Sequence, residues 1–453
     1  MLFPPVSSLI YHISESKSSF FFFENLAVSG SSIGPRLSPA LACALQIAAA
    51  IVRLVPGCGE AAPSMNKPGI PRKKSLQSVL IKPAGPDCNM VCSYCFYREK
   101  EALFPGAPTH RMNDDVLEET MRQLFAQPVP ALSIGWQGGE PTLMGLDFFR
   151  KAVDLQIRFG RGKSVGNGLQ TNGLLLDAAW ANFLKDYRFL VGLSLDGPEH
   201  IHDHYRRLAG GQATWARTVD AANLLLAAGA AVNALVVVND YSARFPEEIY
   251  RFHKDLGLNH MQFIPCVECD PDDPGRAAPF SVPAEAFGRF LCAVFDLWLA
   301  DFKGGEPTTF IRFFDSLFFR YVDREPPECD LLAECGTYLV IEHNGDVYAC
   351  DFFVEERWKL GNVKNGKLVH MLNSARQTEF GRMKAALPGP CRACAWLRYC
   401  SGGCTKDRLR DPRDAGLSHF CGGYKKFFAH ADPHFRTLAD VWNARQRTAP
   451  TDE

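Results

Sequence analysis

The sequence predicts an α/β protein: a parallel sheet, either open or curved into a partial barrel, followed by a smaller cysteine-rich module. Two observations lead to this prediction. From residue 75 onward, six short apolar runs rich in β-branched residues alternate with amphipathic patterns, which is typical of parallel strands joined by helical crossovers. From residue 329 onward, cysteines recur at short spacings, which in a large chain favours metal or cluster ligation.

The six apolar runs are the expected strands, at residues 79–82, 132–136, 165–170, 190–194, 232–238 and 261–264. Residues 113–127 between two of them should form a helix, with Asn113 as its N-cap and acidic residues at its positive end. Residues 215–228 should form another helix, which Gly229 ends. Strands and helices therefore alternate along this half of the chain.

Polar and glycine-rich turns follow the expected strands. In βα architectures the carboxyl ends of parallel strands share one rim, where ligands bind. Ordinary turns use the same residue types, so each turn alone is weak evidence, whereas their repetition on one rim favours a ligand site. These turns are Gln137-Gly138-Gly139-Glu140-Pro141, Thr171-Asn172-Gly173, Asp196-Gly197-Pro198, Asn239-Asp240 and Pro265-Cys266.

The pattern changes after residue 280. Residues 284–302 read as one long helix with an apolar face, which indicates core packing. Residues 338–350 read as a hairpin with Asn344-Gly345 as its turn. Near the end, residues 424–442 read as an amphipathic helix broken near Pro433.

The chain has 453 residues and a formal net charge of -1, so its composition gives no case for nucleic acid or an anionic membrane as a partner. Its 16 cysteines would indicate disulfides in a small secreted protein. In a chain this long, with cysteines at CxxC-type spacings, ligation is favoured over disulfides. We therefore expect a reducing compartment, the cytoplasm.

Residues 1–64 differ from the rest of the chain. The stretch 37–55 is apolar but contains Pro39, Gln46 and Arg53, which makes it a poor membrane span. The cationic start of a secretory signal is missing. We expect the functional protein to begin near Met65 and residues 1–74 to be a disordered or upstream extension, with no role for its two cysteines.

Three cysteines follow the first expected strand at once. Cys88, Cys92 and Cys95 have the spacing CxxxCxxC. Three thiolates in one tight loop can hold three irons of a cubane cluster, which leaves the fourth iron open to a small molecule.

Eight more cysteines lie in the second half of the chain. Eight is the number that two fully ligated four-iron clusters need, and two structural zinc sites need the same number. We assign Cys266 and Cys269 a structural role, because nothing nearby completes a metal site. We expect Cys292 to be a small buried hydrophobic residue. The eight are Cys329, Cys335, Cys350, Cys391, Cys394, Cys400, Cys404 and Cys421.

Several motifs together resemble the radical S-adenosylmethionine enzymes that carry a twin-cluster SPASM domain, and among them most the anaerobic sulfatase-maturating enzymes. The motifs are LIKPAGPDCNMVCSYCFY, QGGEPTL, LQTNG, FLVGLSLDGP, CDFF and CRACAWLRYCSGGC. The resemblance implies a partial (β/α)6 TIM-like barrel followed by a small cysteine-rich α+β SPASM domain. It places the barrel with a bridging helix at 75–305, the SPASM domain at 306–428, and a C-terminal helix and tail at 429–453.

The resemblance also implies the cofactors: S-adenosylmethionine and three [4Fe-4S] clusters. The open iron of the first cluster would bind the methionine end of S-adenosylmethionine, and one electron would release a 5′-deoxyadenosyl radical. The positions that match the family's cofactor contacts are Tyr97, Gly138, Gly139, Glu140, Ser194, Arg206 and Val267.

In the second module the resemblance pairs Cys329, Cys335, Cys350 and Cys404 around one cluster, and Cys391, Cys394, Cys400 and Cys421 around the other. Spacing alone leaves open a site of four consecutive cysteines. Asp351 matches the family's general base, which takes the proton of the substrate thiol or hydroxyl. Without the resemblance, an aspartate at this place would read as a turn or capping residue.

The implied reaction is the oxidation of a cysteine or serine in a sulfatase to Cα-formylglycine (3-oxoalanine). The implied partners are an unfolded or nascent sulfatase with a C/S-x-P/A-x-R segment, bound as an extended peptide by a monomer, and an electron donor such as a flavodoxin or ferredoxin. One alternative is another SPASM peptide maturase that makes a thioether or carbon–carbon crosslink. An alternative of another class is a non-catalytic iron–sulfur or zinc protein that binds or transfers electrons.

Overall fold

A ten-stranded sheet organises the structure, a computed structural model that describes residues 73–106, 108–303 and 307–448. Residues 1–72 of the expected N-terminal extension, including Cys43 and Cys58, lie outside these residues. The strand order is β10-β9-β8-β1-β2-β3-β4-β5-β6-β7. The strands are β1 (Ser78–Lys82), β2 (Ala131–Trp136), β3 (Ser164–Thr171), β4 (Leu190–Ser194), β5 (Ala231–Val238), β6 (His260–Pro265), β7 (Phe310–Ile311), β8 (Leu339–Glu342), β9 (Asp346–Tyr348) and β10 (Lys359–Asn362).

The helices of the first half alternate with these strands, and those of the second half are shorter. The α-helices are α3 (Asp114–Phe125), α4 (Leu146–Gly160), α5 (Ala178–Asp186), α6 (Glu199–Tyr205), α7 (Trp215–Ala228), α8 (Pro246–Asp255), α9 (Ala284–Ala300), α10 (Arg312–Tyr321), α11 (Leu368–Leu372), α12 (Ala375–Ala385), α13 (Gly389–Arg392), α14 (Leu397–Cys400) and α15 (Cys421–Thr448). The 3-10 helices are η2 (Arg98–Leu103), η3 (Pro141–Met144), η4 (Ser242–Arg244), η5 (Cys329–Leu331), η6 (Asp351–Phe353), η7 (Glu356–Trp358), η8 (Lys406–Arg408) and η9 (Pro412–Asp414).

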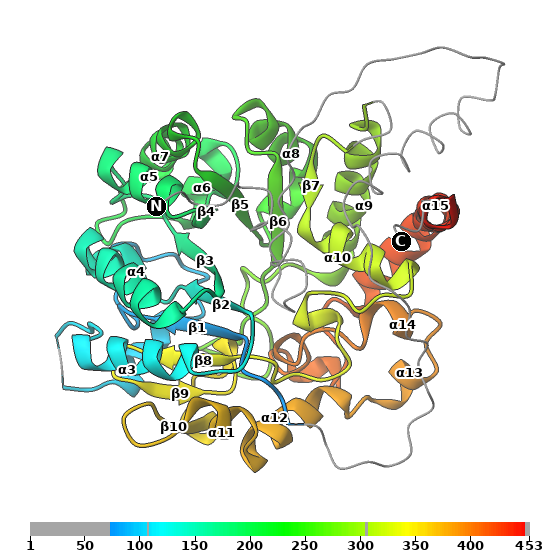
Figure 1. Ribbon diagram of the computed structural model, residues 1–453. Coiled ribbons are helices and arrows are strands. Elements are labelled where there is room, and N and C mark those ends of the chain that lie inside the picture. The colour runs from blue at the N-terminus through cyan, green and yellow to red at the C-terminus, as the bar shows by residue number, and fades with distance from the viewer. Residues whose placement is uncertain (1–72, 107, 304–306, 449–453) are drawn as a thin grey trace.

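Strands β1 to β7 pair in parallel in sequence order, with helices α3 to α8 around the outside (Figure 1). The six predicted strands are all present, and β4 has the predicted bounds. Two predicted caps are also confirmed: the side chain of Asn113 accepts a hydrogen bond from the Val116 N–H, and Gly229 ends α7 with φ of 78°. The α/β prediction is therefore confirmed.

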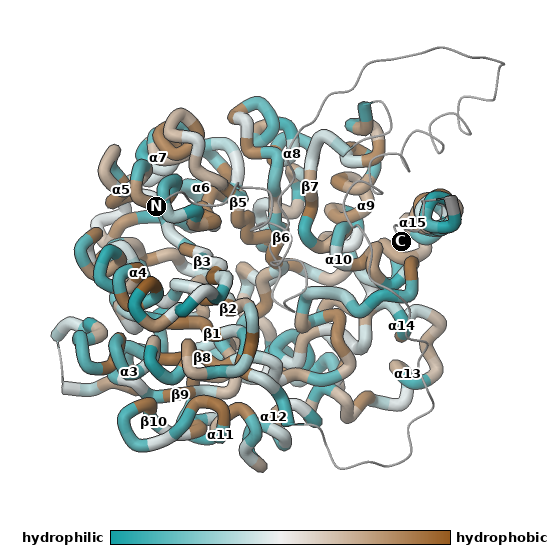
Figure 2. The backbone as a smooth tube through the Cα atoms, in the orientation of Figure 1, coloured by the Kyte–Doolittle hydropathy of each residue, from teal (hydrophilic) through white to brown (hydrophobic). Residues whose placement is uncertain are grey.

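The second cysteine-rich module joins the same sheet. Its predicted hairpin forms β8 and β9, and β8 pairs in parallel with β1. Successive side chains of β1 and of β8 point to opposite faces of the sheet. Val79 and Ile81 pack in the main core against the helices, whereas the other face of β1 and β8 packs against the segment after the first cysteine loop. Figure 2 shows apolar stretches along β1 and β8 at this junction.

The predicted break near Pro433 is wrong, because α15 runs unbroken through that residue. A proline inside a helix removes one N–H donor, and here packing against α9 offsets that loss. Phe427 and Phe435 of α15 both contact Phe295 of α9, with ring centroids 5.7 and 5.2 Å apart. The domain boundary expected after residue 428 falls inside this helix.

Among the helices that the structure describes, none is long and apolar enough to cross a bilayer.

Candidate active site

The first three cysteines lie together in the loop after β1. Burial, the neighbouring carboxylate of Glu140 and the thiols of Cys92 and Cys95 together raise the pKa of the Cys88 thiol to about 12. Burial likewise raises the pKa of Cys92 to about 11. A bound cation or cluster would offset these effects, because it binds the thiolates and displaces their protons.

The glycine turn after β2 lies directly against this loop. The backbone N–H of Gly139 donates to the Gly85 carbonyl at 2.8 Å, and that of Glu140 donates to the Asp87 carbonyl at 2.7 Å. A Cβ on Gly139 would lie 1.9 Å from the Asp87 carbonyl oxygen, and Gly138 has φ of +129°. Only glycine permits this approach and this backbone conformation.

The side chain of Glu140 holds the turn in place. One carboxylate oxygen accepts from the Thr142 backbone and from the hydroxyls of Thr142 and Thr171, and the other accepts from the Asn172 N–H at 2.8 Å. Burial raises the pKa of this carboxyl, and the hydrogen bonds oppose that shift. The predicted cofactor turn is thereby tied to the end of β3, and the Asn172 amide in turn lies 3.8 Å from the Cys88 sulfur.

Arg206 is buried beside the cysteine loop in a network around Asp196. Its guanidinium donates to both Asp196 carboxylate oxygens at 2.9 and 3.1 Å, and the Tyr94 hydroxyl donates to the same carboxylate at 2.6 Å. Burial opposes the charge of Arg206, but the Asp196 carboxylate outweighs it, so the pKa of Arg206 is raised. Arg206 in turn lowers the pKa of Cys92 against the larger effect of burial. A fixed cation therefore lies next to the loop.

The remaining predicted cofactor residues lie at the ends of other strands. Ser194 is the last residue of β4, and Val267 follows β6 and is fully buried. Tyr97 is also buried, and its hydroxyl donates to the carboxylate of Glu342. The structure thus gathers the predicted residues along the carboxyl ends of β2, β4 and β6 and behind the loop after β1.

The eight later cysteines fall into two groups. Burial raises the pKa of Cys404 well above its usual value, and Asp407 and then the thiols of Cys350, Cys329 and Cys335 raise it further. Burial also raises the pKa of Cys400, with added effects from the thiols of Cys394, Cys391 and Cys421. These neighbours are the two quartets that the family resemblance implies, and Cys404 lies with the first one.

The cysteine sulfurs of these groups are not gathered as they are around one zinc ion. Four thiolates around one zinc at about 2.3 Å would lie roughly 3.8 Å apart. Among the described residues, only Asp411, Asp414 and His419 place three such ligand atoms within 4.8 Å of one another, and Asp411 is already paired with Arg413. In a four-iron cluster each thiolate binds a separate iron, so the sulfurs lie farther apart than those around one zinc ion. None of the described cysteines forms a disulfide.

Asp351 begins η6 immediately after Cys350 and forms a buried ion pair with Lys82, the last residue of β1. Its backbone N–H donates to the Tyr338 hydroxyl at 3.5 Å, and that hydroxyl lies 3.5 Å from the Cys350 sulfur. Its side chain keeps a relative exposure of 10%. A carboxylate is therefore fixed next to the first quartet but stays accessible.

The segment that bears Asp351 also contacts the first cysteine loop. Phe352 follows Asp351, Phe96 follows Cys95, and the centroids of the two rings are 4.9 Å apart. Residues from the two modules therefore form one site.

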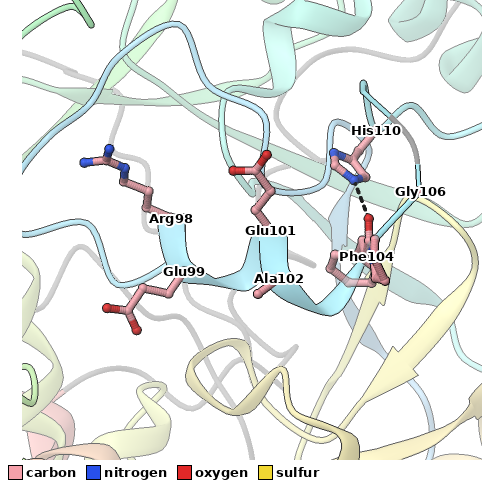
Figure 3. Close-up of a pocket in the computed structure, with 8 residues that line it drawn as sticks. Arg98, Glu99, Glu101, Ala102, Phe104, Gly106 and His110 are labelled. Carbon is pink, nitrogen blue, oxygen red and sulfur yellow. Dashed lines mark hydrogen bonds between the residues drawn. The ribbon is translucent and has the colours of Figure 1, made fainter. Parts of the chain in front are cut away.

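Four buried polar residues of this site were not predicted from the sequence: Tyr94, Lys82, Asp196 and Glu342. Asp196 was expected only as part of a turn, and not as the carboxylate that pairs with Arg206. Lys82 carried the clearest signal, because it ends an apolar strand where a charge needs a partner. Its partner could not be read from the sequence. A pocket of about 470 Å³ beside η2 (Figure 3) is lined by residues that include Arg98, Glu101 and His110, and none of the cysteines lines it.

The comparisons with known proteins agree with this arrangement. Residues 83–253 match the radical SAM superfamily, and residues 333–395 match an iron–sulfur cluster-binding domain of the SPASM type. Each match falls inside the domain expected for it.

Several relatives and solved structures cover most of the chain. The serine-type anaerobic sulfatase-maturating enzyme of Bacteroides thetaiotaomicron is 38% identical over 79% of this chain and 89% of its own length. The cysteine-type enzyme of Clostridium perfringens is 34% identical over 80% of this chain and 98% of its own. A solved structure of native anSMEcpe with bound AdoMet and Cp18Cys peptide superposes with a TM-score of 0.73, at 33% identity, over 80% of this chain and 99% of that chain. This chain belongs to the anaerobic sulfatase-maturating enzymes of the radical SAM superfamily.

Proposed function

We propose that the protein oxidises a cysteine or serine in an unfolded sulfatase segment to Cα-formylglycine, with S-adenosylmethionine as the oxidant. The observation that carries this proposal is the position of Asp351: a fixed carboxylate between the first cysteine loop and the first later quartet. A serine-type relative and a cysteine-type relative match the chain over about the same share of its length. We therefore propose the reaction for both residue types.

The substrate carbon must lose a hydrogen atom, while its sulfur or oxygen loses a proton and one electron leaves. For serine this gives the aldehyde directly. For cysteine it gives a thioaldehyde, which water hydrolyses to the aldehyde with release of hydrogen sulfide. When bound, S-adenosylmethionine and the clusters supply the radical that takes the hydrogen atom and accept the remaining electron. The chain itself supplies the proton acceptor. We assign the S–H or O–H proton to the carboxylate of Asp351, because a positioned carboxylate at hydrogen-bond distance is a general base.

The residues around the two modules fit the cofactors. Cys88, Cys92 and Cys95 leave one iron of a four-iron cluster without a protein ligand. Arg206 is a buried cation beside that loop, suited to a carboxylate of the bound cofactor. The two later quartets would hold one four-iron cluster each.

We further propose that the protein acts as a monomer in the cytoplasm and receives electrons from a small donor such as a flavodoxin or ferredoxin. The free cysteines of the described residues support a reducing compartment. The substrate should be a C/S-x-P/A-x-R segment bound in extended form.

An anaerobic assay of reconstituted protein tests the function. The protein is incubated with S-adenosylmethionine, a reductant and either of two peptides that differ only in the Cys or Ser of the motif. We expect 5′-deoxyadenosine together with a peptide aldehyde, identified by hydrazine trapping and mass spectrometry. 5′-Deoxyadenosine with a crosslinked peptide and no aldehyde would indicate a crosslinking maturase. No S-adenosylmethionine cleavage at all, in protein that holds its clusters, would indicate a binding or electron-transfer protein.

A further inference from the structure

Lys82 is a lysine that is completely buried in the structure. It is the last residue of β1, its relative exposure is 0%, and its amino group forms an ion pair with Asp351. A buried charge is costly unless it is paired. A lysine in this position therefore needs the carboxylate, and the carboxylate in turn is held by the lysine.

The pairing of β1 with β8 fixes where this amino group lies. Lys82 stands opposite Glu342 in the parallel register, and both point to the side of the sheet that packs against Tyr97. The Lys82 nitrogen lies 3.6 Å from the centroid of the Tyr97 ring, while the Tyr97 hydroxyl donates to Glu342. An ammonium over an aromatic face is attracted to it. Two groups therefore hold the lysine head, the Tyr97 ring and the Asp351 carboxylate, and Glu342 in turn holds the Tyr97 hydroxyl.

The backbone on the other side also restrains Lys82. A Cβ on Gly138 would lie 3.2 Å from the Lys82 Cβ, so the cofactor turn is packed against the stem of the lysine. The lysine thus touches the turn, the aromatic residue after the first cysteine loop and the proposed base. A displacement of Lys82 would move Asp351 relative to the rest of the site.

We propose that Lys82 is a positioning residue that aims the Asp351 carboxylate at the substrate thiol or hydroxyl. This inference rests on the proposed function. The ion pair engages Oδ1 of Asp351, and Oδ2 takes the substrate proton. Lys82 keeps its own protons throughout, so no bond to it forms or breaks, and its effect on the reaction passes entirely through Asp351.

A double-mutant cycle tests this dependence. Four proteins are assayed anaerobically: wild type, Lys82→Met, Asp351→Asn, and the double variant. The readout is the aldehyde formed per 5′-deoxyadenosine formed, which separates oxidation of the substrate from cleavage of the cofactor. We expect Lys82→Met to lower this ratio at least about tenfold, because a misplaced catalytic group costs that much or more. In the Asp351→Asn background the same change should have no further effect.

The matched control is Lys254→Met, which removes the Lys254–Asp301 ion pair between α8 and the end of α9. It should keep the wild-type ratio. Iron content and affinity for S-adenosylmethionine, measured by equilibrium dialysis, should stay at wild-type values in the Lys82 variants. A loss of either would show that Lys82 holds the cofactor site rather than the base, and would overturn the proposal.

Two further outcomes would also overturn it. One is a wild-type ratio in Lys82→Met. The other is a double variant whose ratio falls below that of Asp351→Asn, since Lys82 would then act on its own. If Lys82→Met alone fails to fold, the double variant, which buries neither charge, still gives the second comparison. A wild-type protein that cleaves the cofactor without forming aldehyde would instead refute the proposed function, and the role of Lys82 with it.

Discussion

Lys82 and Asp351 form a buried ion pair that joins the two modules of the protein. Lys82 ends the first strand of the barrel, and Asp351 follows a cysteine of the second module. The pair can form because β8 of the second module adds to the free edge of β1. The proposed base is therefore part of the barrel's own interior rather than of an independent domain.

The grouping of the later cysteines predicts how iron is lost from variants. The wild-type protein should hold about twelve irons in three clusters. Cys350→Ala with Cys404→Ala should leave about eight irons, because both ligands belong to one quartet. Cys350→Ala with Cys400→Ala should leave about four, because two quartets are broken. Iron analysis and Mössbauer spectroscopy of anaerobically purified protein measure this.

About four irons in both double variants would contradict the grouping. If four consecutive cysteines formed one site, Cys404 would share a cluster with Cys400. The pair Cys400→Ala with Cys404→Ala would then cost one cluster, not two. Cys292→Ala is the matched control, since Cys292 lies in α9 among core residues, and it should keep the full iron content.

The Arg206–Asp196 pair predicts how tightly S-adenosylmethionine binds. Arg206→Lys removes the bidentate geometry that holds the guanidinium against Asp196. We expect the dissociation constant of S-adenosylmethionine to rise roughly tenfold or more, equivalent to about 1.4 kcal/mol. Equilibrium dialysis with cluster-loaded protein measures it. Arg251→Lys, in an exposed pair on α8, should bind as the wild type does, and an equal affinity of the two variants would remove Arg206 from the cofactor site.

Because His202 is buried, we expect the free energy of unfolding to fall in mild acid. It is fully buried, its Nδ1 accepts from the Asp196 N–H, and its Nε2 lies 3.1 Å from the Thr214 hydroxyl. Burial and then the nearby Arg206 lower its pKa from 6.5 to about 4. Between these values the unfolded chain binds a proton that the folded chain does not, so stability is full above about pH 6.5 and falls as the pH drops toward 4.

His202→Gln should remove this dependence. Its free energy of unfolding should fall about 1 kcal/mol less than that of the wild type between pH 7 and pH 5.5. Urea titrations under anaerobic conditions at the two pH values give the difference. His204→Gln is the control, because His204 is an exposed histidine of the same helix. Parallel curves for wild type and His202→Gln would mean that His202 is already charged in the folded protein.

The sequence predicts the local elements of this fold well. Strand β4 and helix α7 have the predicted bounds, because an apolar β-branched run and an amphipathic run ended by glycine are both local signals. The break predicted near Pro433 is absent from the C-terminal helix. There, aromatic packing against α9 outweighs the local penalty of a proline, and such packing is not visible in a local pattern.

The site residues also divide into those that a local motif predicts and those that depend on long-range contacts. The cysteines, the glycine turn and Asp351 could be named because each belongs to a motif. Lys82 and Glu342 could not, because their roles come from a register between strands that are far apart in the chain. The placement of Cys404 with Cys350 likewise depends on how the chain folds back. Long-range pairing of this kind leaves no signal in spacing.

The most direct test of the account is the effect of Asp351→Asn on aldehyde formation. Asparagine keeps the shape of the side chain but cannot accept the substrate proton as a carboxylate does. The aldehyde formed per 5′-deoxyadenosine should fall roughly 10²- to 10⁴-fold, while iron content and cofactor cleavage persist. Formation of aldehyde by Asp351→Asn at the wild-type ratio would contradict the assignment of Asp351 as the base.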